Sequence, residues 1–104
     1  MAVSWWVYCC FAAVVLRHTG PVWEVEWAHP KFGAMIASCG YDRQVIVHKE
    51  NAEGAWQPVH YHRDHESSVN SVAWAPHEHG LVLACASSDG RVSILTHKGA
   101  LSVQ

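Results

Sequence analysis

Three side chains in the first half of the chain have the chemistry of a hydrolase triad. His18 could act as the base, Asp42 could orient it, and Ser38 could be the nucleophile. Such a triad needs a hydroxyl that the histidine deprotonates and a carboxylate that fixes the imidazole. The residue types therefore allow acyl transfer, and their spacing decides whether that chemistry is expected.

The same spacing occurs a second time. His18 precedes Asp42 by 24 residues, and His65 precedes Asp89 by the same number. In the second copy Cys85 stands in place of the serine. An enzyme rarely needs its site twice in tandem, whereas a buried His and Asp that hydrogen-bond to each other satisfy a structural need. We therefore predict two structural His–Asp pairs and no enzymatic activity.

Metal chemistry has weaker support. His60 and His62 are two residues apart, so on a strand they share one face, and His77 and His79 flank a glutamate. A zinc site needs three or four convergent ligands with supporting partners, and no further cluster with such spacing is present. The sequence also lacks a phosphate-binding glycine-rich loop and a G-x-S-x-G turn. We expect no metal and no cofactor.

The composition describes a small folded domain with little charge. Half of the 104 residues are apolar, six are Trp, and the formal net charge is −2. A nucleic-acid-binding surface needs clustered Lys and Arg, and the seven present are dispersed, so direct nucleic-acid binding is not expected. The cysteines form no C-x-x-C motif, which favours reduced core residues and a cytosolic compartment. They are Cys9, Cys10, Cys39 and Cys85.

An internal repeat organises the chain. When the sequence is shifted by 47 residues without gaps, nine residues meet identical ones. The matched pairs are His18/His65, Val22/Val69, Val25/Val72, Trp27/Trp74, Ala28/Ala75, Gly33/Gly80, Ala37/Ala84, Asp42/Asp89 and Val45/Val92. A gapless match of this length does not arise by chance, so we expect two copies of one structural unit.

Each copy consists of short apolar or alternating segments separated by turn residues. Pro58 cannot donate a hydrogen bond to a neighbouring strand, which places its segment at a sheet edge. Four short strands in one repeat, arranged antiparallel, are typical of a β-propeller blade. We therefore predict an all-β fold of about two four-stranded antiparallel blades. The expected strands are 22–28, 34–39, 44–49 and 56–62 in the first copy, and 69–75, 81–86 and 91–97 in the second.

The first sixteen residues are apolar except for Ser4. A membrane-spanning helix needs about 20 such residues. A secretory signal carries a basic segment ahead of its apolar stretch, and no Lys or Arg precedes Arg17. Three interpretations stay open: a membrane or signal segment, a structural arm packed on the fold, and a leader that is not the natural start of the domain. We assign residues 1–15 as an atypical apolar leader.

Two segments resemble a specific family of WD-repeat proteins. The first is VWEVEWAHP (22–30) followed by ASCGYDR (37–43), and the second is SSVNSVAWAPH (67–77) followed by SSDG (87–90). Over about residues 16–98 they are similar to the second and third blades of the Sec-thirteen family of coat proteins. A sister nucleoporin of the same coat class shares the first segment and fits the second less well, and it is the alternative.

The resemblance implies one WD repeat at 16–62 and another at 63–104, truncated in its fourth strand. In such repeats the His before the first strand hydrogen-bonds to the Asp of the turn before the third strand. A Ser or Thr and a Trp often complete the network. On this sequence the network would contain the pairs His18–Asp42 and His65–Asp89, supported by Ser38, Trp27 and Trp74.

The resemblance also implies a non-catalytic scaffold. Members of the family form six-bladed open propellers that a partner coat subunit completes with a further blade. They serve the COPII vesicle coat in transport from the endoplasmic reticulum to the Golgi, the nuclear-pore outer ring in mRNA transport, and a lysosome-associated signalling complex. We therefore expect coat and nucleoporin subunits as partners, peripheral membrane association through the coat, and no small-molecule substrate. The alternative class is a small membrane-tethered or secreted β protein.

Departures from the family pattern qualify these expectations. His48 and Leu95 stand where the repeat usually ends its third strand with Trp. Residues 1–15 match nothing in the family's first blade, and the position at which a partner inserts its blade falls on no residue of this sequence. Because two blades leave apolar faces and strand edges open, we expect the chain alone to be marginally stable.

Overall fold

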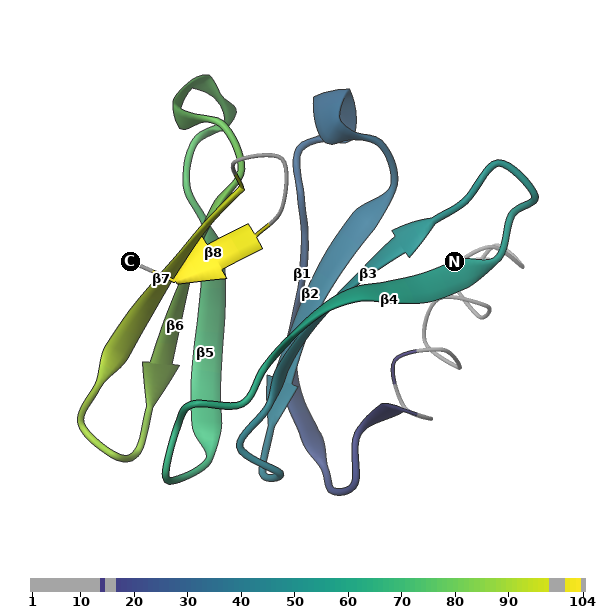
Figure 1. Cartoon of the computed structure of the whole chain (residues 1–104). Helices are drawn as coiled ribbons and strands as arrows, with labels where there is room; N and C mark the ends of the chain where they lie inside the picture. The colour runs from purple at the N-terminus through teal and green to yellow at the C-terminus, as the bar shows by residue number, and fades with distance from the viewer. Residues whose placement is uncertain (1–13, 15–16, 98–100, 104) are drawn as a thin grey trace, which may run out of the picture.

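The computed structural model describes residues 14, 17–97 and 101–103, with the backbone only for His97 and 101–103. In this part of the chain the strands form two separate antiparallel sheets, in the order β1-β2-β3-β4 and β5-β6-β7-β8 (Figure 1). The first sheet consists of β1 (Val22–Trp27), β2 (Met35–Gly40), β3 (Val45–Glu50) and β4 (Trp56–His62). The second consists of β5 (Val69–Trp74), β6 (Val82–Ser87), β7 (Val92–His97) and β8 (Leu101–Val103).

The prediction of two four-stranded blades is confirmed. Each strand expected from the sequence is present, and its ends differ from the expected ends by no more than one residue. The fourth strand of the second sheet, β8, is only three residues long. Both sheets are simple meanders because each strand pairs with the next one along the chain.

The connections repeat as faithfully as the strands. A short 3-10 helix follows the first strand of each sheet: η1 (Pro30–Phe32) after β1 and η2 (His77–His79) after β5. Each ends at a glycine with positive φ, Gly33 at 88° and Gly80 at 82°. Glycine adopts this left-handed conformation without the steric cost of a Cβ, so the repeated glycine fixes the turn. The two 3-10 helices lie at the same end of the molecule (Figure 1).

One glycine brings the chain before β1 against the end of β2. A Cβ on Gly40 would collide with the carbonyl oxygen of Pro21, and the next residue, Tyr41, donates its N–H to that same oxygen at 3.0 Å. The close approach places the loop of residues 18–20 beside the turn that follows β2. Those two segments carry His18 and Asp42.

The edge position expected for Pro58 is confirmed, because β4 is an outer strand and pairs only with β3. The register of this pairing shifts between Val47 and His48, which face His60 and Pro58, so Val59 is an extra residue in the ladder. Such a bulge accommodates a residue that cannot donate a hydrogen bond.

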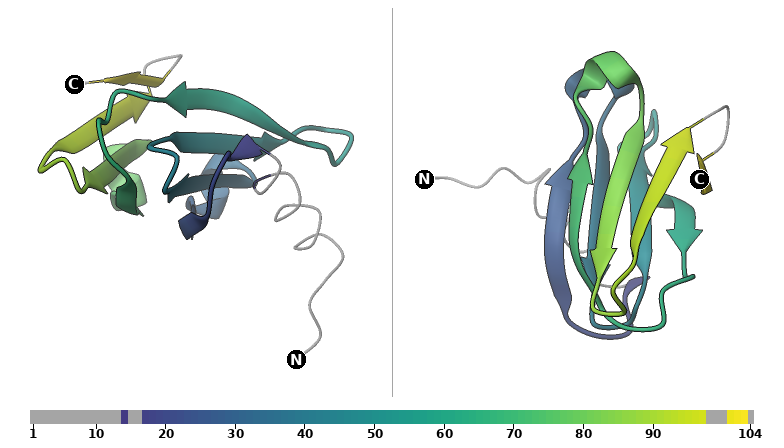
Figure 2. Two further views of the ribbon diagram at one scale, coloured as in Figure 1. Left: turned by 90° about the horizontal axis from the view of Figure 1, so that it is seen from below. Right: turned by 90° about the vertical axis from the view of Figure 1, so that its left-hand side faces the viewer.

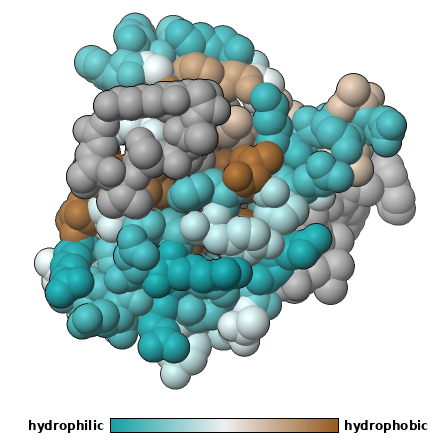
Figure 3. Space-filling model, viewed as in Figure 1, coloured by the Kyte–Doolittle hydropathy of each residue, from teal (hydrophilic) through white to brown (hydrophobic). Residues whose placement is uncertain are grey.

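The two sheets pack face to face as adjacent blades (Figure 2). The first sheet contributes one set of apolar side chains and the second another. They are Met35, Ala37, Cys39, Val45 and Val47 on one side, and Val69, Val72, Leu83, Cys85 and Leu95 on the other. Space-filling Figure 3 shows a largely hydrophilic face, on which hydrophobic side chains appear in a few patches. The core therefore lies between the blades, where apolar burial favours their association.

Cys39 and Cys85 lie within this core as free thiols. Burial raises the pKa of each to about 12, so both stay protonated at neutral pH and behave as small apolar residues. Cys9 and Cys10 lie outside the described residues.

Polar contacts add to the blade interface. The carboxylate of Glu24 on β1 accepts hydrogen bonds from the Ser71 hydroxyl at 3.1 Å and the Val72 N–H at 3.3 Å. The Trp74 indole donates to the carbonyl of Glu26 at 3.1 Å. These directional contacts fix the position of β5 against β1, which nondirectional apolar packing does not.

The opposite face of the first sheet carries a second, smaller cluster. Val14, Ile36 and Trp56 are its buried members, and Val14 is 1% exposed. The proposed leader, 1–15, otherwise lies outside the described residues, so its three interpretations stay open. Within the described part of the chain no helix is long and apolar enough to cross a membrane.

His48 is a buried polar residue whose hydrogen-bonding groups are not satisfied in the described core. Its side chain lies on the same face as Ile36 and is fully buried, yet neither ring nitrogen has a hydrogen-bond partner among the described residues. Burial is the main cause that lowers the pKa of His48 from 6.5 to about 4, and the neighbouring His18 and Arg17 add to it. The matching residue of the second sheet, Leu95, is buried and apolar.

Replacing His48 with the residue that the second repeat carries should stabilise the chain. We expect His48→Leu to raise the free energy of unfolding at pH 7.5 by about 1–3 kcal/mol, because it removes two buried nitrogens that lost their hydrogen bonds to water. Urea denaturation measures the change. The reverse substitution, Leu95→His, is the matched control and should lower stability. An unchanged or less stable His48→Leu protein would contradict this account.

The parent chain should also lose stability in mild acid. The unfolded chain protonates His48 near pH 6.5, whereas the folded chain resists protonation down to about pH 4. Acid therefore favours unfolding progressively over this range, by up to about 3 kcal/mol from this residue. Denaturation curves of the parent and His48→Leu at pH 7.5, 6, 5 and about 4 isolate this contribution. If the free energy of unfolding of the two proteins fell equally with pH, His48 would not be the cause of the acid sensitivity.

Candidate functional site

The loop before β1 and the turn after β2 meet through three side chains. Nδ1 of His18 lies 2.9 and 3.0 Å from the two carboxylate oxygens of Asp42. Its Nε2 lies 2.8 Å from the Ser38 hydroxyl. A carboxylate only accepts hydrogen bonds, so Nδ1 carries a proton and, in the neutral imidazole, Nε2 accepts from Ser38. The three groups satisfy one another.

Asp42 also organises the backbone around it. Its carboxylate accepts the N–H of Thr19 at 2.9 Å, the N–H of Gln44 at 3.3 Å and the side-chain amide of Gln44 at 2.9 Å. Desolvation raises its pKa, but the hydrogen bonds from Thr19, His18 and Gln44 outweigh it and leave the pKa below its usual value. The charged carboxylate thus holds the loop before β1 against the turn after β2.

The second blade repeats the arrangement. Nδ1 of His65 lies 3.1 Å from Asp89, whose carboxylate also accepts the N–H groups of Glu66 and Arg91 at 2.9 Å each. Although desolvation opposes the shift, these donors hold the pKa of Asp89 below its usual value. The structure therefore places both predicted His–Asp pairs within hydrogen-bond distance.

Sequence reasoning missed the hydroxyl of the second blade. Cys85 occupies the place of Ser38 and supplies no comparable hydrogen bond, but Nε2 of His65 lies 2.9 Å from the Ser93 hydroxyl on β7. Ser38 faces Ile46 across the first sheet, and Cys85 faces Ser93 across the second. The hydroxyl has moved to the other member of the same cross-strand pair. A search of the strand opposite Cys85 would have found it.

Ser93 also joins the two blades. His65 donates from Nδ1 to Asp89, so its Nε2 accepts the Ser93 proton. Nε2 of His62, at the end of β4, lies 3.0 Å from the same hydroxyl and must be the donor of that bond. Burial lowers the pKa of His62, which is consistent with this neutral donor. A single hydroxyl thus connects the last strand of one blade to the His–Asp pair of the next.

The two tryptophans expected to support the His–Asp pairs act elsewhere. Trp74 ends β5, far along the strand from His65, and bridges to Glu26 of the other blade. Trp27 ends β1 and packs edge-to-face against Trp56 with ring centroids 5.7 Å apart. The prediction that the two tryptophans support the His–Asp pairs is therefore corrected. Each Trp lies at the end of its strand, and the histidine lies in the loop before the start of that strand.

Ser38, His18 and Asp42 are hydrogen-bonded in the same order as a hydrolase triad, but a substrate cannot reach the serine. Ser38 is 0% exposed, and its hydroxyl proton is directed to the imidazole inside the blade. Nucleophilic catalysis requires a substrate carbonyl in contact with this oxygen. The packing of β2 and β3 leaves no room for one, so the geometry stabilises the blade.

The histidines considered as metal ligands are placed apart. His62 contacts Ser93, while His77 stacks against His29 with ring centroids 3.9 Å apart, joining the two 3-10 helices. His60 lies on β4 with its Nε2 buried. Across the residues that the structure describes, no three His, Cys, Asp or Glu side chains gather into a metal-binding group.

Comparison with known proteins agrees with this geometry. Residues 23–103 match the family model described as the anaphase-promoting complex subunit 4 WD40 domain. The chain belongs to the WD40-repeat family. A WD40 assignment accounts for two blades with equivalent His–Asp pairs, because the repeat specifies both the strands and the loops that the pairs hold together.

Similar WD40 proteins support the resemblance to the Sec-thirteen family. The chain is 62% identical over 79 residues to the protein SEC13 homolog of Drosophila melanogaster, covering 76% of this chain and 22% of that protein. It is 46% identical over 102 residues to the protein transport protein SEC13 of Mycosarcoma maydis, covering 76% and 28%. It is 45% identical over 103 residues to that of Cryptococcus neoformans, covering 88% and 31%. The chain thus spans less than a third of these relatives.

The Ser93 assignment predicts a specific pattern of loss and recovery. Ser93→Ala should lower the stability of this WD40 chain by about 1–3 kcal/mol, because it leaves His65 without a donor and His62 without an acceptor. Adding Cys85→Ser should recover part of that loss by returning a hydroxyl to His65 from the opposite strand. Thermal and urea unfolding measure both variants. A silent Ser93→Ala, or a double variant no better than Ser93→Ala, would show that Ser93 has no such role.

Proposed function

We propose that this chain is a non-catalytic scaffold of a protein-transport coat. The observation that carries the proposal is the pair of WD40 blades in a chain whose relatives are named protein transport protein SEC13. Buried His–Asp–hydroxyl networks hold the connections of both blades, so the chain presents fixed surfaces. A fixed surface suits protein–protein contact, since little conformational entropy is lost on binding.

The second blade carries a face that suits such a contact. One face of the first sheet packs against the second through Met35, Ala37, Cys39, Val45 and Val47. The equivalent residues of the second sheet lie 47 positions later on its outward face, and Val92 is 66% exposed. They are Val82, Ala84, Ala86, Val92 and Ile94. A further blade, whether from the same polypeptide or from a partner, would bury this face as the second blade buries the first.

The resemblance to the Sec-thirteen family suggests which assemblies the chain would serve. The partners would be coat and nucleoporin subunits that complete an open propeller, and membrane association would be peripheral, through the coat. The assemblies would be the COPII coat on the cytoplasmic face of the endoplasmic reticulum and the nuclear-pore outer ring, with the lysosome-associated complex as a further place. Residues 16–62 would serve as a second-blade-like repeat and 63–104 as a third-blade-like repeat.

Proximity labelling in cells tests the proposal. The full chain fused to a biotin ligase should label subunits of the COPII coat above the level given by the ligase alone. Labelling of nucleoporins without coat subunits would favour the sister nucleoporin instead. Labelling of neither group would contradict the proposed scaffold role.

Two surface substitutions make the test specific. Val92→Lys places a charge on the outward face of the second blade, whereas Val59→Lys places one on the edge strand β4, where Val59 is 54% exposed. Neither side chain belongs to the buried core, so both variants should fold. We expect Val92→Lys to reduce coat labelling at least severalfold and Val59→Lys to leave it unchanged. Equal labelling by the two variants would exclude this face as the contact.

A further inference from the structure

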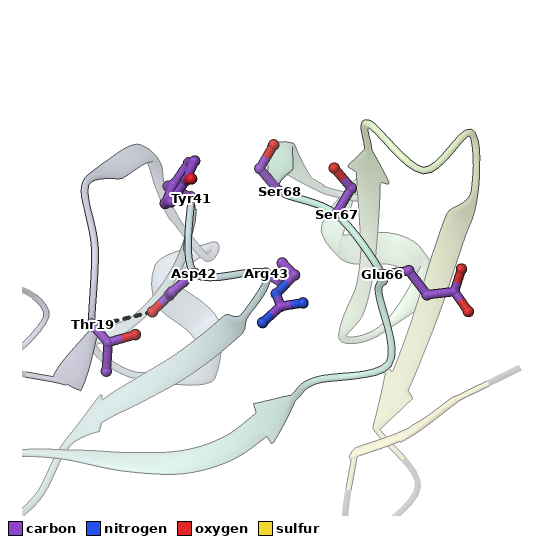
Figure 4. Close-up of a pocket in the computed structure, with 7 residues that line it drawn as sticks. All are labelled: Thr19, Tyr41, Asp42, Arg43, Glu66, Ser67 and Ser68. Carbon is purple, nitrogen blue, oxygen red and sulfur yellow. Dashed lines mark hydrogen bonds between the residues drawn. The ribbon is translucent and has the colours of Figure 1, made fainter.

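Two arginines line a cleft at the end of the blades where the His–Asp pairs lie. The cleft has a volume of about 440 Å³ and is bounded by Asp42, Arg43, Gln44, Arg63 and His65. A neighbouring hollow shares Asp42 and Arg43 and extends to Thr19 and to Ser67 and Ser68 on the connection between the blades (Figure 4). Both blades therefore contribute to one polar surface with two guanidinium groups.

Arg43 occupies its position at a conformational cost. Its φ of 70° lies in the left-handed region, where a side chain clashes with the backbone, and the second repeat has Gly90 at the matching place with φ of 82°. The same turn therefore has a glycine in the second repeat and an arginine, which is less favourable in this conformation, in the first. Among the described residues, the Arg43 guanidinium has no hydrogen bond or ion pair. Residues held in such conformations are found at ligand-binding sites.

Arg63 is held in place by its neighbours. Its Nε donates to the Gln44 side-chain oxygen at 2.7 Å, and its guanidinium lies 4.4 Å from the centre of the Tyr61 ring. The Gln44 amide is fixed in turn by Asp42, whose carboxylate is held by His18. The terminal nitrogens of Arg63 make no hydrogen bond within the described residues. A guanidinium fixed in this way loses little freedom when it binds an anion.

The acidic side chains that line the cleft and the neighbouring hollow, Asp42 and Glu66, do not form ion pairs with the two arginines. The Asp42 carboxylate already accepts bonds from His18, Thr19 and Gln44. The Glu66 side chain points away from Arg43, while the guanidinium of Arg43 lies between the two connections (Figure 4). Both guanidinium groups line the cleft and can form the charge-assisted hydrogen bonds that carboxylates and phosphates accept.

We propose that this cleft binds an oxyanion, a carboxylate or a phosphate, presented by a peptide segment of a partner protein. Arg63 and Arg43 provide the donors from opposite connections, and the hydroxyls of Thr19, Ser67 and Ser68 line the adjoining wall. The inference rests on the proposed scaffold function only for the source of the peptide. The anion site itself is a property of the described residues.

Nuclear magnetic resonance titration of the full chain tests the site. The probes are three short Gly/Ser peptides that differ only in a central triplet of Glu, phosphoserine or Gln. We expect the Glu or the phosphoserine peptide to shift the Nε–H signals of Arg43 and Arg63 and the amides of Ser67 and Ser68, with no shift from the Gln peptide. The stronger of the two anionic peptides identifies the source of the oxyanion. Equal shifts with the Gln peptide would overturn the proposal.

Arg43→Gly separates binding from structure. It should weaken binding of the anionic peptide roughly tenfold, as expected for a lost charge-assisted hydrogen bond. Because glycine tolerates the turn, the variant should melt at or above the temperature of the parent chain. Arg63→Lys keeps the charge but loses the fixed fork, and should also weaken binding. Arg91→Gln, at an exposed arginine outside the cleft, is the matched control and should leave binding unchanged.

Two outcomes would count against the site. Equal binding by the parent and Arg43→Gly would show that Arg43 makes no contact with the anion. Tighter binding of a short RNA oligomer than of either anionic peptide would assign the arginines to nucleic acid. Peptide binding with failed coat labelling would overturn the scaffold proposal alone, and coat labelling without peptide binding would overturn the anion site alone.

Discussion

The hydrogen bond between a loop histidine and a turn aspartate is the constraint on which the rest of this structure depends. In each blade it holds the segment before the first strand against the turn between the second and third strands. The carboxylate also accepts backbone N–H groups from both segments, Thr19 and Gln44 in one blade and Glu66 and Arg91 in the other. Short strands with irregular connections gain a fixed geometry from a few buried, fully satisfied polar groups.

That constraint extends from each blade to its neighbour. The Ser93 hydroxyl serves the second His–Asp pair and also accepts from His62 at the end of the first sheet. The first pair fixes Gln44 through Asp42, and Gln44 fixes Arg63 on the connection to the second blade. Apolar packing supplies the driving force for blade association, while these polar contacts determine how the blades are aligned. His48 shows the contrary case, a buried polar ring without partners in the described core.

Much of the fold could be predicted because its determinants are local or repeated. Alternating apolar residues and turn glycines indicated the strands of each copy, and Pro58 indicated the edge position of β4 in the first copy. The 47-residue period carried the same assignment to the second copy and revealed the equal spacing of His18–Asp42 and His65–Asp89. Periodicity reports which residue types face a core, but it does not report which individual side chains meet across a sheet or between blades.

The sequence by itself therefore determined the strands and the equal spacing of the two His–Asp pairs, since both follow from the pattern of the repeat. Only the tertiary structure decided that Ser93 replaces the missing hydroxyl opposite Cys85, and that Trp74 binds the neighbouring blade. It also decided that Arg63 and Arg43 line the same cleft. These contacts join residues on different strands or blades, so they depend on strand register and blade packing. Both arise from the whole chain folding together, and no local pattern specifies them.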